Sequence, residues 1–577
     1  MIKSILKRII NKISSRIGLK VKNKWSDYYN NIPPKLKYDS GSMVDAILLS
    51  ATLYPDNIAL EYYNHQITYL EFISKIKDCA KGLRQQGIKE NDYVSICMPN
   101  TPEAIVMFYA INMVGAVANM IHPLSSEKEI EFYLNKSQSK IILTIDICYL
   151  KVMNIIKTTK VEKVIVASAT KSMSRLVKML YWLLKGRKIK IDRKNNSVLT
   201  WDDFISSGES FRTDFYTKRD AKDIAVILYS GGTTGKPKGI KLSNLNFNAG
   251  ALQSRYMSET IKPSNSFLTI LPNFHAFGIG ISIHTPLYNG MKSILIPQFE
   301  IKKFAKVIKK FQPNVIVGVP SLFSALLKIK LGPNDLKCLT LTACGGDSIP
   351  IEMKKKVNDY FHQHGSTTDL RIGYGLTECT GACCLCPEGL ENKADIIGIP
   401  FLDNEFKIVK IGTHEAAESN EDGEICISGP NVMLGYLDEV EETKDTLVDH
   451  GDGKIWLHTG DIGCLDNNGF LYFKSRLKRM FVTSGYNIYP KYIEEILLKQ
   501  PSISAVAIVG HPHPYKGEVG KAYIVLKNGI SPTKEVKKDI QKYLKLNLGD
   551  YAIPDEIKYV DCLPMTLVGK VSYKDLK

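Results

Sequence analysis

The chain lacks the patterns that mark several classes of protein. Its 12 cysteines have no regular disulfide spacing, which excludes a small disulfide-bonded scaffold and favours a reducing compartment. It shows no internal repeat and no low-complexity segment, which excludes a solenoid or a disordered array. No zinc-finger, helix-turn-helix or RNA-recognition pattern accompanies the net charge of +17, so no nucleic-acid partner is expected.

Long apolar runs are scarce as well. Residues 104–121 carry no charge over a length at the threshold for a membrane span. Asn112, Gly115 and Asn119 interrupt this run, and a proline brackets it on each side. The run therefore predicts a buried helix, a glycine turn and a short strand rather than a span.

Acidic residues are absent from residues 1–24, whereas basic residues are frequent there. At the helical period, the apolar residues from Ile2 to Ile17 fall on one side, largely opposite the basic side chains. The segment has no continuous apolar core, so it does not resemble a secretory signal. It predicts a basic amphipathic helix on an anionic membrane surface, and the alternative is that the apolar stripe packs on the protein's own body.

A second stretch without acids, residues 171–190, carries Tyr181 and Trp182, which suit a water–lipid boundary. The alternative for this stretch is a surface helix on a domain insertion.

Cysteines gather locally at Cys379, Cys383, Cys384 and Cys386. Both metal binding and the packing of small residues behind a loop fit such a cluster, and packing is the favoured interpretation.

At 577 residues the chain is too long for a single core. Short β-rich runs alternate with helical stretches from Asp56 to about Gly429, which predicts parallel sheets covered by helices. From Glu405 to Phe473 the predicted strands come closer together, with Asp-Gly and Asn-Gly turns that suggest an antiparallel, barrel-like part. A compact α+β segment follows. We therefore predict an α/β fold in three parts: a membrane-surface helix (1–24), a large domain (25–477) and a smaller, mobile C-terminal lid (478–577).

A glycine-rich loop, Tyr229-Ser-Gly-Gly-Thr-Thr-Gly-Lys-Pro-Lys-Gly239, directly follows the apolar run 224–228. Such a loop after a short strand presents backbone N–H groups and hydroxyls to a phosphate, and Lys236 and Lys238 add positive charge. Pro237 stands where the magnesium-binding Ser or Thr of a Walker A loop would be, so this is a phosphate loop of another kind.

Further motifs follow this loop along the chain. They are Pro272-Asn-Phe-His-Ala-Phe-Gly278, Gly345-Gly-Asp347, Gly373-Tyr-Gly-Leu-Thr-Glu378, Gly423-Glu-Ile-Cys-Ile-Ser-Gly-Pro430, Trp456-Leu-His-Thr-Gly-Asp461, Ser475-Arg-Leu-Lys478 and Leu563-Pro-Met-Thr-Leu-Val-Gly-Lys570. In kind, order and spacing they resemble the motifs of the adenylate-forming (AMP-binding) superfamily, which includes acyl-CoA synthetases, amino-acid adenylation domains and luciferase. The resemblance implies an enzyme that uses ATP and Mg²⁺ to activate a carboxylate as acyl-AMP and then transfers the acyl group to CoA.

The resemblance also implies roles for single residues. Thr377 would contact the α-phosphate, and Glu378 would ligate Mg²⁺, a hard cation that prefers carboxylate oxygen. Tyr374 would face adenine, while Asp461 and Arg476 would hold the ribose. The implied nucleotide-binding set is Ser230, Gly231, Gly232, Thr233, Thr234, Gly235, Lys236, Gly345, Gly346, Asp347, Tyr374, Gly375, Asp461 and Arg476.

In the same family a C-terminal lysine bridges the attacking carboxylate and the α-phosphate, and Lys570 stands at its position. A compact, mobile charge suits a group that is needed in only one of two half-reactions. Lys478 falls at the family's hinge, and the loop with Gly485 and Tyr486 would present the other face of the lid for attack by the CoA thiol.

The expected substrate is an uncharged medium- or long-chain fatty acid. Amino-acid-activating relatives carry an Asp within the motif at 272–278, and this chain has no acid there. The motif in this chain, with His275 and Phe277, resembles the version found in acyl- and aryl-CoA ligases. His275 is expected to be one of the catalytic residues. The opening segments of the chain resemble long-chain fatty acid–CoA ligases. Gly318 and Gly373 are expected to border the acyl tail, since a missing side chain leaves room there.

Two alternatives remain within the family: a ligase that stops at acyl-AMP or loads a carrier protein, and an aryl-CoA ligase. A catalytically silent, basic membrane- or nucleic-acid-binding protein is disfavoured, because Lys570, Glu378 and Asp461 are all present. The expected location is the cytoplasm, peripherally on the cytoplasmic face of the membrane.

Overall fold

The computed structural model describes residues 25, 28–29, 36–168, 191–192, 195–230, 237–390, 396–483, 486–488, 490–513, 516–548, 552–566 and 570–576. The expected membrane-surface helix (1–24) and the basic stretch at 171–190 lie outside these residues. The same holds for residues 231–236 of the glycine-rich loop and for Gly485.

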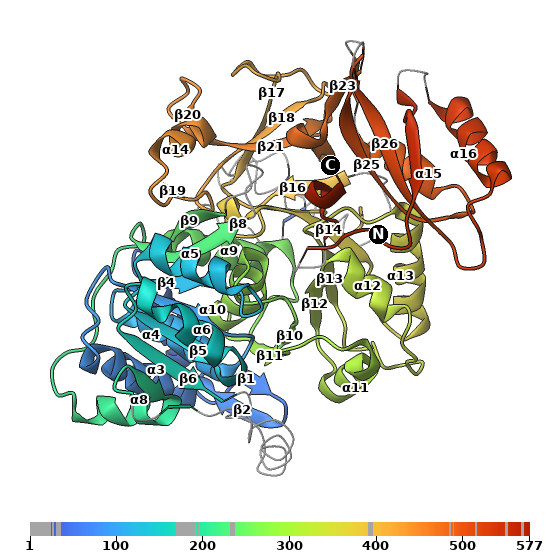
Figure 1. Ribbon diagram of the computed structural model, residues 1–577. Coiled ribbons are helices and arrows are strands. Elements are labelled where there is room, and N and C mark those ends of the chain that lie inside the picture. The colour runs from blue at the N-terminus through green and yellow to red at the C-terminus, as the bar shows by residue number, and fades with distance from the viewer. Residues whose placement is uncertain are drawn as a thin grey trace, which may run out of the picture.

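The fold is α/β, as predicted, and the larger part of the chain forms two sheets flanked by helices (Figure 1). The first sheet has eight strands in the order β19-β9-β8-β4-β3-β5-β6-β7. All neighbours from β8 to β7 run parallel, whereas β9 runs antiparallel to both β8 and β19. Its strands are β3 (Tyr93–Cys97), β4 (Val117–Met120), β5 (Ile141–Ile145), β6 (Lys163–Ala167), β7 (Val198–Thr200), β8 (Ile224–Ser230), β9 (Lys238–Ser243) and β19 (Gly435–Tyr436).

Helices cover this sheet and link it to the second one. Four of them, α2, α3, α5 and α9, begin at capping boxes in which the hydroxyl of a Ser or Thr accepts the third backbone N–H of the helix; these residues are Ser42, Thr68, Ser126 and Ser243. The helices are α2 (Met43–Leu53), α3 (Tyr69–Gln85), α4 (Pro102–Met113), α5 (Glu127–Ser137), α6 (Tyr149–Ile155), α8 (Trp201–Ser207), α9 (Asn244–Met257) and α10 (Thr285–Tyr288).

The structure confirms the prediction of a helix, a turn and a strand for the uncharged run at 104–121. Every residue of α4 is buried, Gly115 turns the chain with a φ of 72°, and β4 follows inside the first sheet. A helix that is apolar on all sides belongs in a protein core when sheet and helices surround it. Within the described part of the chain, no helix is long and apolar enough to cross a membrane.

The second sheet has fourteen strands, and its first half is built from parallel neighbours. Only the hairpin from β1 to β2 at its edge is antiparallel. Figure 1 shows α12 and α13 beside the strands that lead to the centre of the molecule. The elements are β1 (Ile58–Tyr62), β2 (His65–Thr68), β10 (Ser266–Thr269), β11 (Lys292–Leu295), β12 (Val315–Gly318), β13 (Leu341–Cys344), β14 (Leu370–Tyr374), α11 (Ile301–Phe311), α12 (Pro320–Leu326) and α13 (Ile351–Gln363).

The second half of this sheet is antiparallel, as the closely spaced turns predict. Gly453 and Gly469 adopt φ values of 74° and 76° in the turns before and after β21, a conformation that glycine adopts without strain. The strands are β15 (Cys384–Leu385), β16 (Ile396–Pro400), β17 (Glu405–Val409), β18 (Gly423–Ser428), β20 (Leu447–Asp449), β21 (Ile455–Leu465) and β22 (Leu471–Arg476), and α14 (Val440–Thr446) precedes β20.

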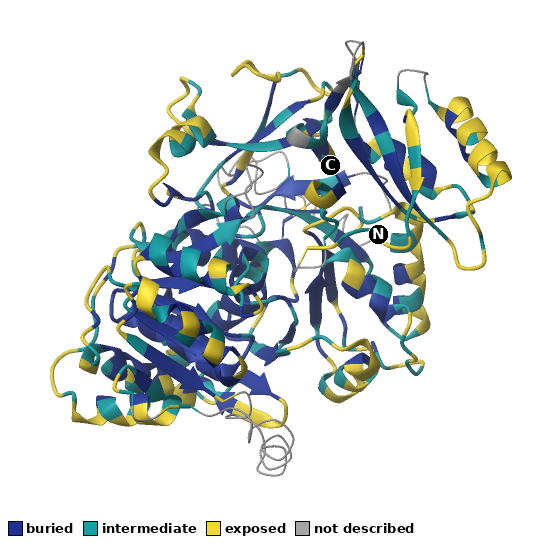
Figure 2. Ribbon diagram, viewed as in Figure 1, coloured by how far each residue is buried: buried dark blue, intermediate teal, exposed yellow. Residues whose placement is uncertain are grey.

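The C-terminal part forms a separate small sheet with its own core. Ile493 and Leu497 of one helix and Ile540 of another pack against the buried strand residues Ile508 and Ile524. Figure 1 shows this part in orange and red above the large sheets, and Figure 2 shows its buried strands and exposed outer helix. Its elements are β23 (Phe481–Thr483), β24 (Tyr486–Ile488), α15 (Pro490–Leu498), β25 (Ile503–His513), β26 (Gly517–Leu526), α16 (Lys534–Asn547) and β27 (Glu556–Tyr559).

Candidate active site

Three of the residues expected to bind nucleotide meet where the ends of β14 and β22 lie beside the middle of β21. Asp461 stands opposite Arg476 in the register of β21 and β22, and the Arg476 Nε lies 3.2 Å from the Asp461 Oδ1. The Tyr374 hydroxyl donates to the other carboxylate oxygen, Oδ2, at 2.8 Å. The Asp461 side chain is 5% exposed, whereas the Arg476 side chain is 57% exposed and reaches toward solvent.

Burial sets the protonation of this group. It raises the pKa of Asp461, and the Arg476 guanidinium and the Tyr374 hydroxyl counteract that rise. The Asp461 charge in turn raises the pKa of Arg476, and burial, followed by the same charge, raises the pKa of Tyr374 well above its usual range. Tyr374 is therefore a phenol that donates, and Asp461 is the acceptor.

A short 3₁₀ turn, η6 (Thr377–Cys379), presents Thr377 and Glu378 directly after β14. The Tyr436 hydroxyl donates to the Glu378 Oε1 at 3.1 Å. Burial raises the pKa of Glu378, while the Tyr436 hydroxyl and the Arg476 charge oppose the rise. None of the described basic side chains forms an ion pair with Glu378 at close range. The carboxylate is thus oriented by a neutral donor and is open to a cation.

Lys570 approaches this region from the C-terminal part. The residue after it, Val571, pairs antiparallel with Met565, and the Lys570 backbone N–H donates to the Thr566 Oγ1 at 3.1 Å. A Cβ atom built on Gly346 would lie 3.6 Å from the Lys570 Nζ, so the lysine lies against the loop after β13. Figure 1 shows the dark red C-terminal segment at the junction of the small sheet and the large part.

The Lys570 ammonium is desolvated without a fixed partner. Burial lowers its pKa, the Arg476 charge lowers it further, and the Asp347 and Asp461 carboxylates oppose the shift. With none of the described residues does its Nζ form a hydrogen bond or an ion pair. Because a desolvated and unpaired charge is costly, this arrangement favours an incoming anion.

His275 lies within range of the Lys570 charge. It precedes a π-helical turn, η5 (Phe277–His284), and its Nδ1 accepts the Phe277 backbone N–H at 3.3 Å. Burial and then the Lys570 charge lower the pKa of His275 to about 4. The imidazole is therefore neutral near pH 7, and it contributes polarity without adding a second positive charge.

The glycines of the remaining motifs allow close approach of the backbone. Gly346 adopts a φ of 81° in the loop after β13, next to Gly345 and the exposed Asp347. A Cβ on Gly375 would lie 2.5 Å from the Gly381 carbonyl oxygen, so a side chain does not fit there.

Two adjacent strands hold the ends of the glycine-rich loop. Ser230 ends β8, and Lys238 begins β9 as its partner in the register. Lys238 forms an ion pair with Glu442, and its Nζ lies 5.1 Å from the centre of the Tyr436 ring. This pairing holds Lys238 at the base of the loop.

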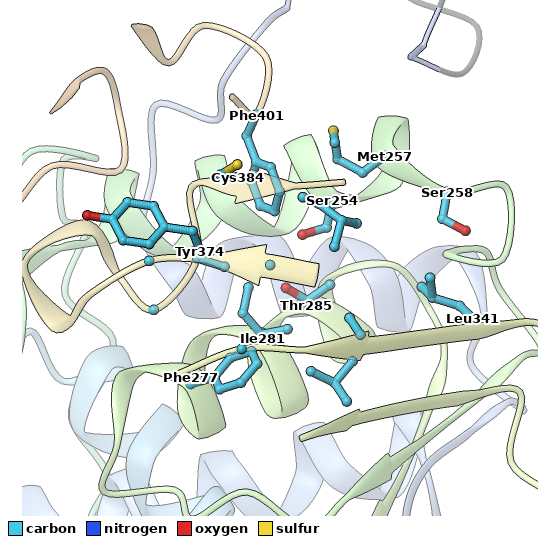
Figure 3. Close-up of a pocket in the computed structure, with 18 of the residues that line it drawn as sticks. Ser254, Met257, Ser258, Phe277, Ile281, Thr285, Leu341, Tyr374, Cys384 and Phe401 are labelled. Carbon is cyan, nitrogen blue, oxygen red and sulfur yellow. The ribbon is translucent and has the colours of Figure 1, made fainter. Parts of the chain in front are cut away.

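An apolar cavity lies between α9, the η5 turn and the ends of β12 to β14 (Figure 3). It holds about 630 Å³ of space, its open part included. Figure 3 shows Met257, Ile281, Leu341 and Phe401 around it, with Tyr374 at one end. The described lining residues are apolar or neutral, so the cavity suits an uncharged apolar group.

The structure corrects one residue predicted for this cavity. Gly373 lines it, as do Gly345 and Gly346, but Gly318 does not. A Cβ on Gly318 would lie 2.3 Å from the Leu322 Cδ2, and the neighbouring Val317 lines the cavity instead. Successive residues of a strand face opposite sides of the sheet, and the prediction chose the wrong one of this pair.

The cysteine cluster after Glu378 packs as the favoured interpretation expects. Cys379, Cys383, Cys384 and Cys386 are all buried, and the Cys379 Sγ accepts the Leu376 backbone N–H at 3.2 Å. Among the described residues, the groups whose possible ligand atoms lie within 4.8 Å of one another do not include this cluster.

The family models match both parts of the chain. The AMP-binding enzyme model matches residues 49–437, and the model of the AMP-binding enzyme C-terminal domain matches residues 492–570. The chain belongs to the AMP-binding enzyme family. Within it, the chain falls among the adenylate-forming acyl- and aryl-CoA ligases.

Several relatives are similar over nearly their whole length. A long-chain-fatty-acid–CoA ligase of Bacillus subtilis is 30% identical over 552 residues, which are 95% of this chain and 96% of the relative. A 4-coumarate–CoA ligase of Petroselinum crispum is 28% identical and covers 88% of each chain. The solved structure of o-succinylbenzoate CoA synthetase from Bacillus subtilis, in complex with its acyl-adenylate intermediate, has a TM-score of 0.74 at 24% identity, with 94% and 99% of the two chains covered. The last comparison shows a shared fold.

Within this AMP-binding enzyme, one site residue escaped the sequence analysis. Tyr436 lies in β19, an edge strand of the first sheet, yet its hydroxyl reaches Glu378. The only feature of the sequence that points to Tyr436 is its position, a few residues after the motif that ends at Pro430. Lys478, the predicted hinge, lies in the turn between β22 and β23, where the large part gives way to the small sheet. Tyr486 begins β24.

Proposed function

We propose that the chain is an AMP-forming ligase that joins a medium- or long-chain fatty acid to CoA. The observation that supports this best is an unpaired ammonium, Lys570, beside Gly346, which also lines the apolar cavity. A fatty acid with its alkyl tail in the cavity would bring its carboxylate to this lysine. Amino acids are disfavoured because a buried ammonium in this cavity would have no counter-charge.

The first half-reaction activates the acid. One carboxylate oxygen attacks the α-phosphorus of ATP, the bond to the β-phosphate breaks, and pyrophosphate leaves with that electron pair. Both reacting groups are anions, so the site has to supply cations and N–H donors. Lys570 would bridge the carboxylate and the α-phosphate, and neutral His275 would leave the charge balance unchanged.

Glu378 fits the ligand of a magnesium ion. It offers a hard carboxylate oxygen, is oriented by Tyr436, and has its pKa raised by burial in a place where a cation would restore its charge balance. A bound Mg²⁺ would neutralise charge on the phosphates. Thr377, its neighbour in the η6 turn, would contact the α-phosphate.

The adenosine would lie along the end of β14 and the middle of β21. Asp461 would accept the ribose hydroxyls, and the exposed Arg476 guanidinium would reach the same sugar. Tyr374 would offer its ring to adenine beside the loop 345–347. The loop 230–236 would hold the departing phosphates.

The second half-reaction transfers the acyl group. The CoA thiol, on losing its proton, attacks the acyl carbonyl, and AMP leaves with the electrons of the broken acyl–phosphate bond. We place a pivot at Lys478, between a large domain (25–477) and a lid (478–577). Rotation would remove Lys570 and bring the loop with Gly485 and Tyr486 to the acyl group.

For residues 1–24 we propose binding to anionic lipid, on the cytoplasmic face of a membrane. Deletion of these residues should reduce sedimentation with anionic vesicles, and turnover of a short soluble fatty acid should stay nearly intact. A loss of thermal stability on deletion would instead support packing of this segment on the protein's body.

A panel of acids tests the substrate. Purified protein receives ATP, Mg²⁺ and one acid, and pyrophosphate, AMP and acyl-CoA are measured separately. Dodecanoate should exceed every standard amino acid. Pyrophosphate release with an amino acid above that with dodecanoate would contradict the proposal. Preference for 4-coumarate would support an aryl-CoA ligase, and acyl-AMP without acyl-CoA would support a ligase for another acceptor.

A further inference from the structure

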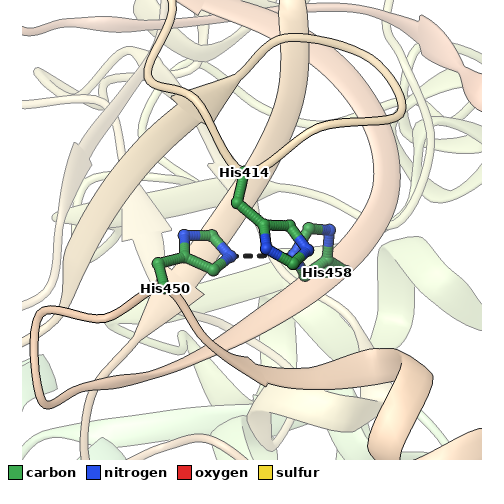
Figure 4. A group of neighbouring side chains, drawn as sticks. All are labelled: His414, His450 and His458. Atoms are coloured by element: carbon green, nitrogen blue, oxygen red, sulfur yellow. Dashed lines mark hydrogen bonds between the residues drawn. The ribbon is translucent and has the colours of Figure 1, made fainter.

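Three histidines gather in the antiparallel part, on the surface beyond the nucleotide residues. His414 lies in the loop between β17 and β18, His450 follows β20, and His458 is on β21 (Figure 4). One ligand atom from each lies within 4.8 Å of the others. His414 is exposed and the other two are half-buried, so the group can be reached from solvent.

Neighbouring groups orient two of these imidazoles. The His458 Nδ1 lies 2.8 Å from the Glu424 Oε2, and a carboxylate there requires Nδ1 to carry the proton. The His458 Nε2 is then an acceptor, and at 2.9 Å it accepts the His450 Nε2–H, whose proton has to move to the His450 Nδ1 or leave when a metal binds at Nε2. His450 is stacked between His414 and Trp456, with ring centroids 5.0 and 5.8 Å away.

This arrangement has the features of a prepared metal ligand. A histidine that binds a metal through one nitrogen usually donates its other N–H to a carboxylate, which fixes the ring and its tautomer. Glu424 holds His458 in that way, and its second oxygen, Oε1, accepts the Gly460 N–H at 2.9 Å. The carboxylate is therefore itself fixed by the backbone.

We propose that one divalent transition-metal ion, such as Zn²⁺, binds to His414, His450 and His458, with water as the remaining ligand. Imidazole nitrogens are ligands that suit zinc, copper and nickel rather than magnesium or calcium. The ion is distinct from the Mg²⁺ expected at Glu378.

Binding requires small changes. Two nitrogens on one tetrahedral Zn²⁺ lie about 3.4 Å apart when each bond is about 2.05 Å, so the two Nε2 atoms have to separate by about 0.5 Å. His414 has to turn out of its stack, and its exposed loop permits that. Lys407, whose Nζ lies 3.3 Å from the His450 Nδ1, has to give up this contact and keep its ion pair with Asp452 at 2.7 Å.

The other side of His458 is less suited to an ion. There Glu424 and Cys426 lie near its Nδ1, but Glu424 already accepts two N–H donors and Cys426 is fully buried. Metal on the Nε2 side leaves those contacts intact. It would join the loop of β17 and β18 and the turn after β20 to β21, three residues before Asp461.

Calorimetric titration tests the site. Full-length protein without an affinity tag, treated with EDTA and desalted, is titrated with ZnCl₂ in the absence of nucleotide. Wild-type protein should bind one more equivalent than a variant with His414→Gln, His450→Gln and His458→Gln combined. Each single change should weaken this binding at least about tenfold. Exposed His65, on β2, supplies the matched control His65→Gln, which should bind as wild type does.

Two further measurements separate this site from others. With CoCl₂ the wild-type protein should show the visible bands of four-coordinate cobalt, and the triple variant should lack them. Zinc should raise the melting temperature of wild type more than that of the triple variant. Zinc that binds at another site, for example at Glu378, would bind to the wild-type protein and to the triple variant equally. Equal stoichiometry and affinity in the wild-type and triple-variant proteins would overturn the proposal.

Discussion

The nucleotide side of the site and the lid lysine are held in place by opposite means. Asp461 accepts a hydrogen bond from Tyr374 and forms an ion pair with Arg476, and the three residues stand on three different strands. Lys570 comes from the C-terminal part, next to the Met565–Val571 pair, and its ammonium has no partner among the described residues. Groups that contact one another keep their geometry without substrate, whereas an unpaired charge is satisfied only when anions arrive.

This contrast bears on the two half-reactions. The AMP moiety is present in both, so the paired residues should serve both steps. The lysine belongs to a lid that we propose to rotate, so it should serve only adenylation. Measuring each half-reaction separately, with acyl-AMP supplied for the second, tests that difference.

The largest effect is expected for Lys570→Ala. Loss of a charge that bridges two anions in the transition state should slow formation of acyl-AMP by about a thousandfold. Acyl-CoA formation from supplied acyl-AMP should stay near the wild-type rate. Because the lysine is desolvated and unpaired, its removal should not lower the melting temperature. Exposed Lys574 gives the control Lys574→Ala, and equal loss of both half-reactions in folded protein would refute the rotating lid.

The next effect is expected for Asp461→Asn, in both half-reactions. The amide cannot accept two ribose hydroxyls and also pair with Arg476, so KM for ATP should rise about tenfold to a hundredfold. Acyl-AMP should be used less efficiently by a similar factor. Asp466→Asn, in the turn after β21, is the control. An effect of Asp461→Asn confined to adenylation would contradict the shared role.

A smaller effect is expected for Tyr374→Phe. It removes only the 2.8 Å hydrogen bond to Asp461, a loss of about 1 kcal/mol that corresponds to about fivefold in each half-reaction. Tyr360→Phe removes a similar bond, to the Ile329 carbonyl, far from the nucleotide. The control should change thermal stability but neither KM nor rate, and equal kinetic effects of the two variants would argue against the assigned role.

The smallest effect is expected from a change of pH: the rate of adenylation should fall at alkaline pH. Burial lowers the pKa of Lys570, so the lysine loses its proton at a lower pH than a free lysine does. Below that pKa it is charged and active, and above it adenylation should decline. The transfer step should lack this decline. Rate profiles of both half-reactions between neutral and alkaline pH measure the difference, and an identical alkaline limb in both would count against Lys570 as its cause.

Local signals in the sequence predicted the α/β fold, whereas the expected site residues came from the resemblance of the motifs to a family. Alternating β and α patterns predicted the parallel strands and the helices that cover them, and the run at 104–121 was interpreted correctly. Contacts made by tertiary structure were not predicted. Tyr436 reaches Glu378 from another sheet, and the three histidines come from a loop, a turn and a strand. Their spacing along the chain therefore predicts neither contact. Gly318 was assigned to the wrong face of β12. This strand is buried on both faces, so all its residues are apolar and the sequence does not show which face each of them takes.

The pairing of distant strands also determines when this protein can fold during its synthesis. β4 pairs with β8, where Ala118 stands opposite Val226. The earlier strand β1 pairs with β11, where Leu60 stands opposite Ser293, and it cannot do so until β11 has been synthesised. Such long loops carry an entropic cost of closure that slows folding. Until β11 leaves the ribosome, the β1–β2 hairpin has an unpaired apolar edge, so the nascent chain is prone to aggregation during that part of its translation.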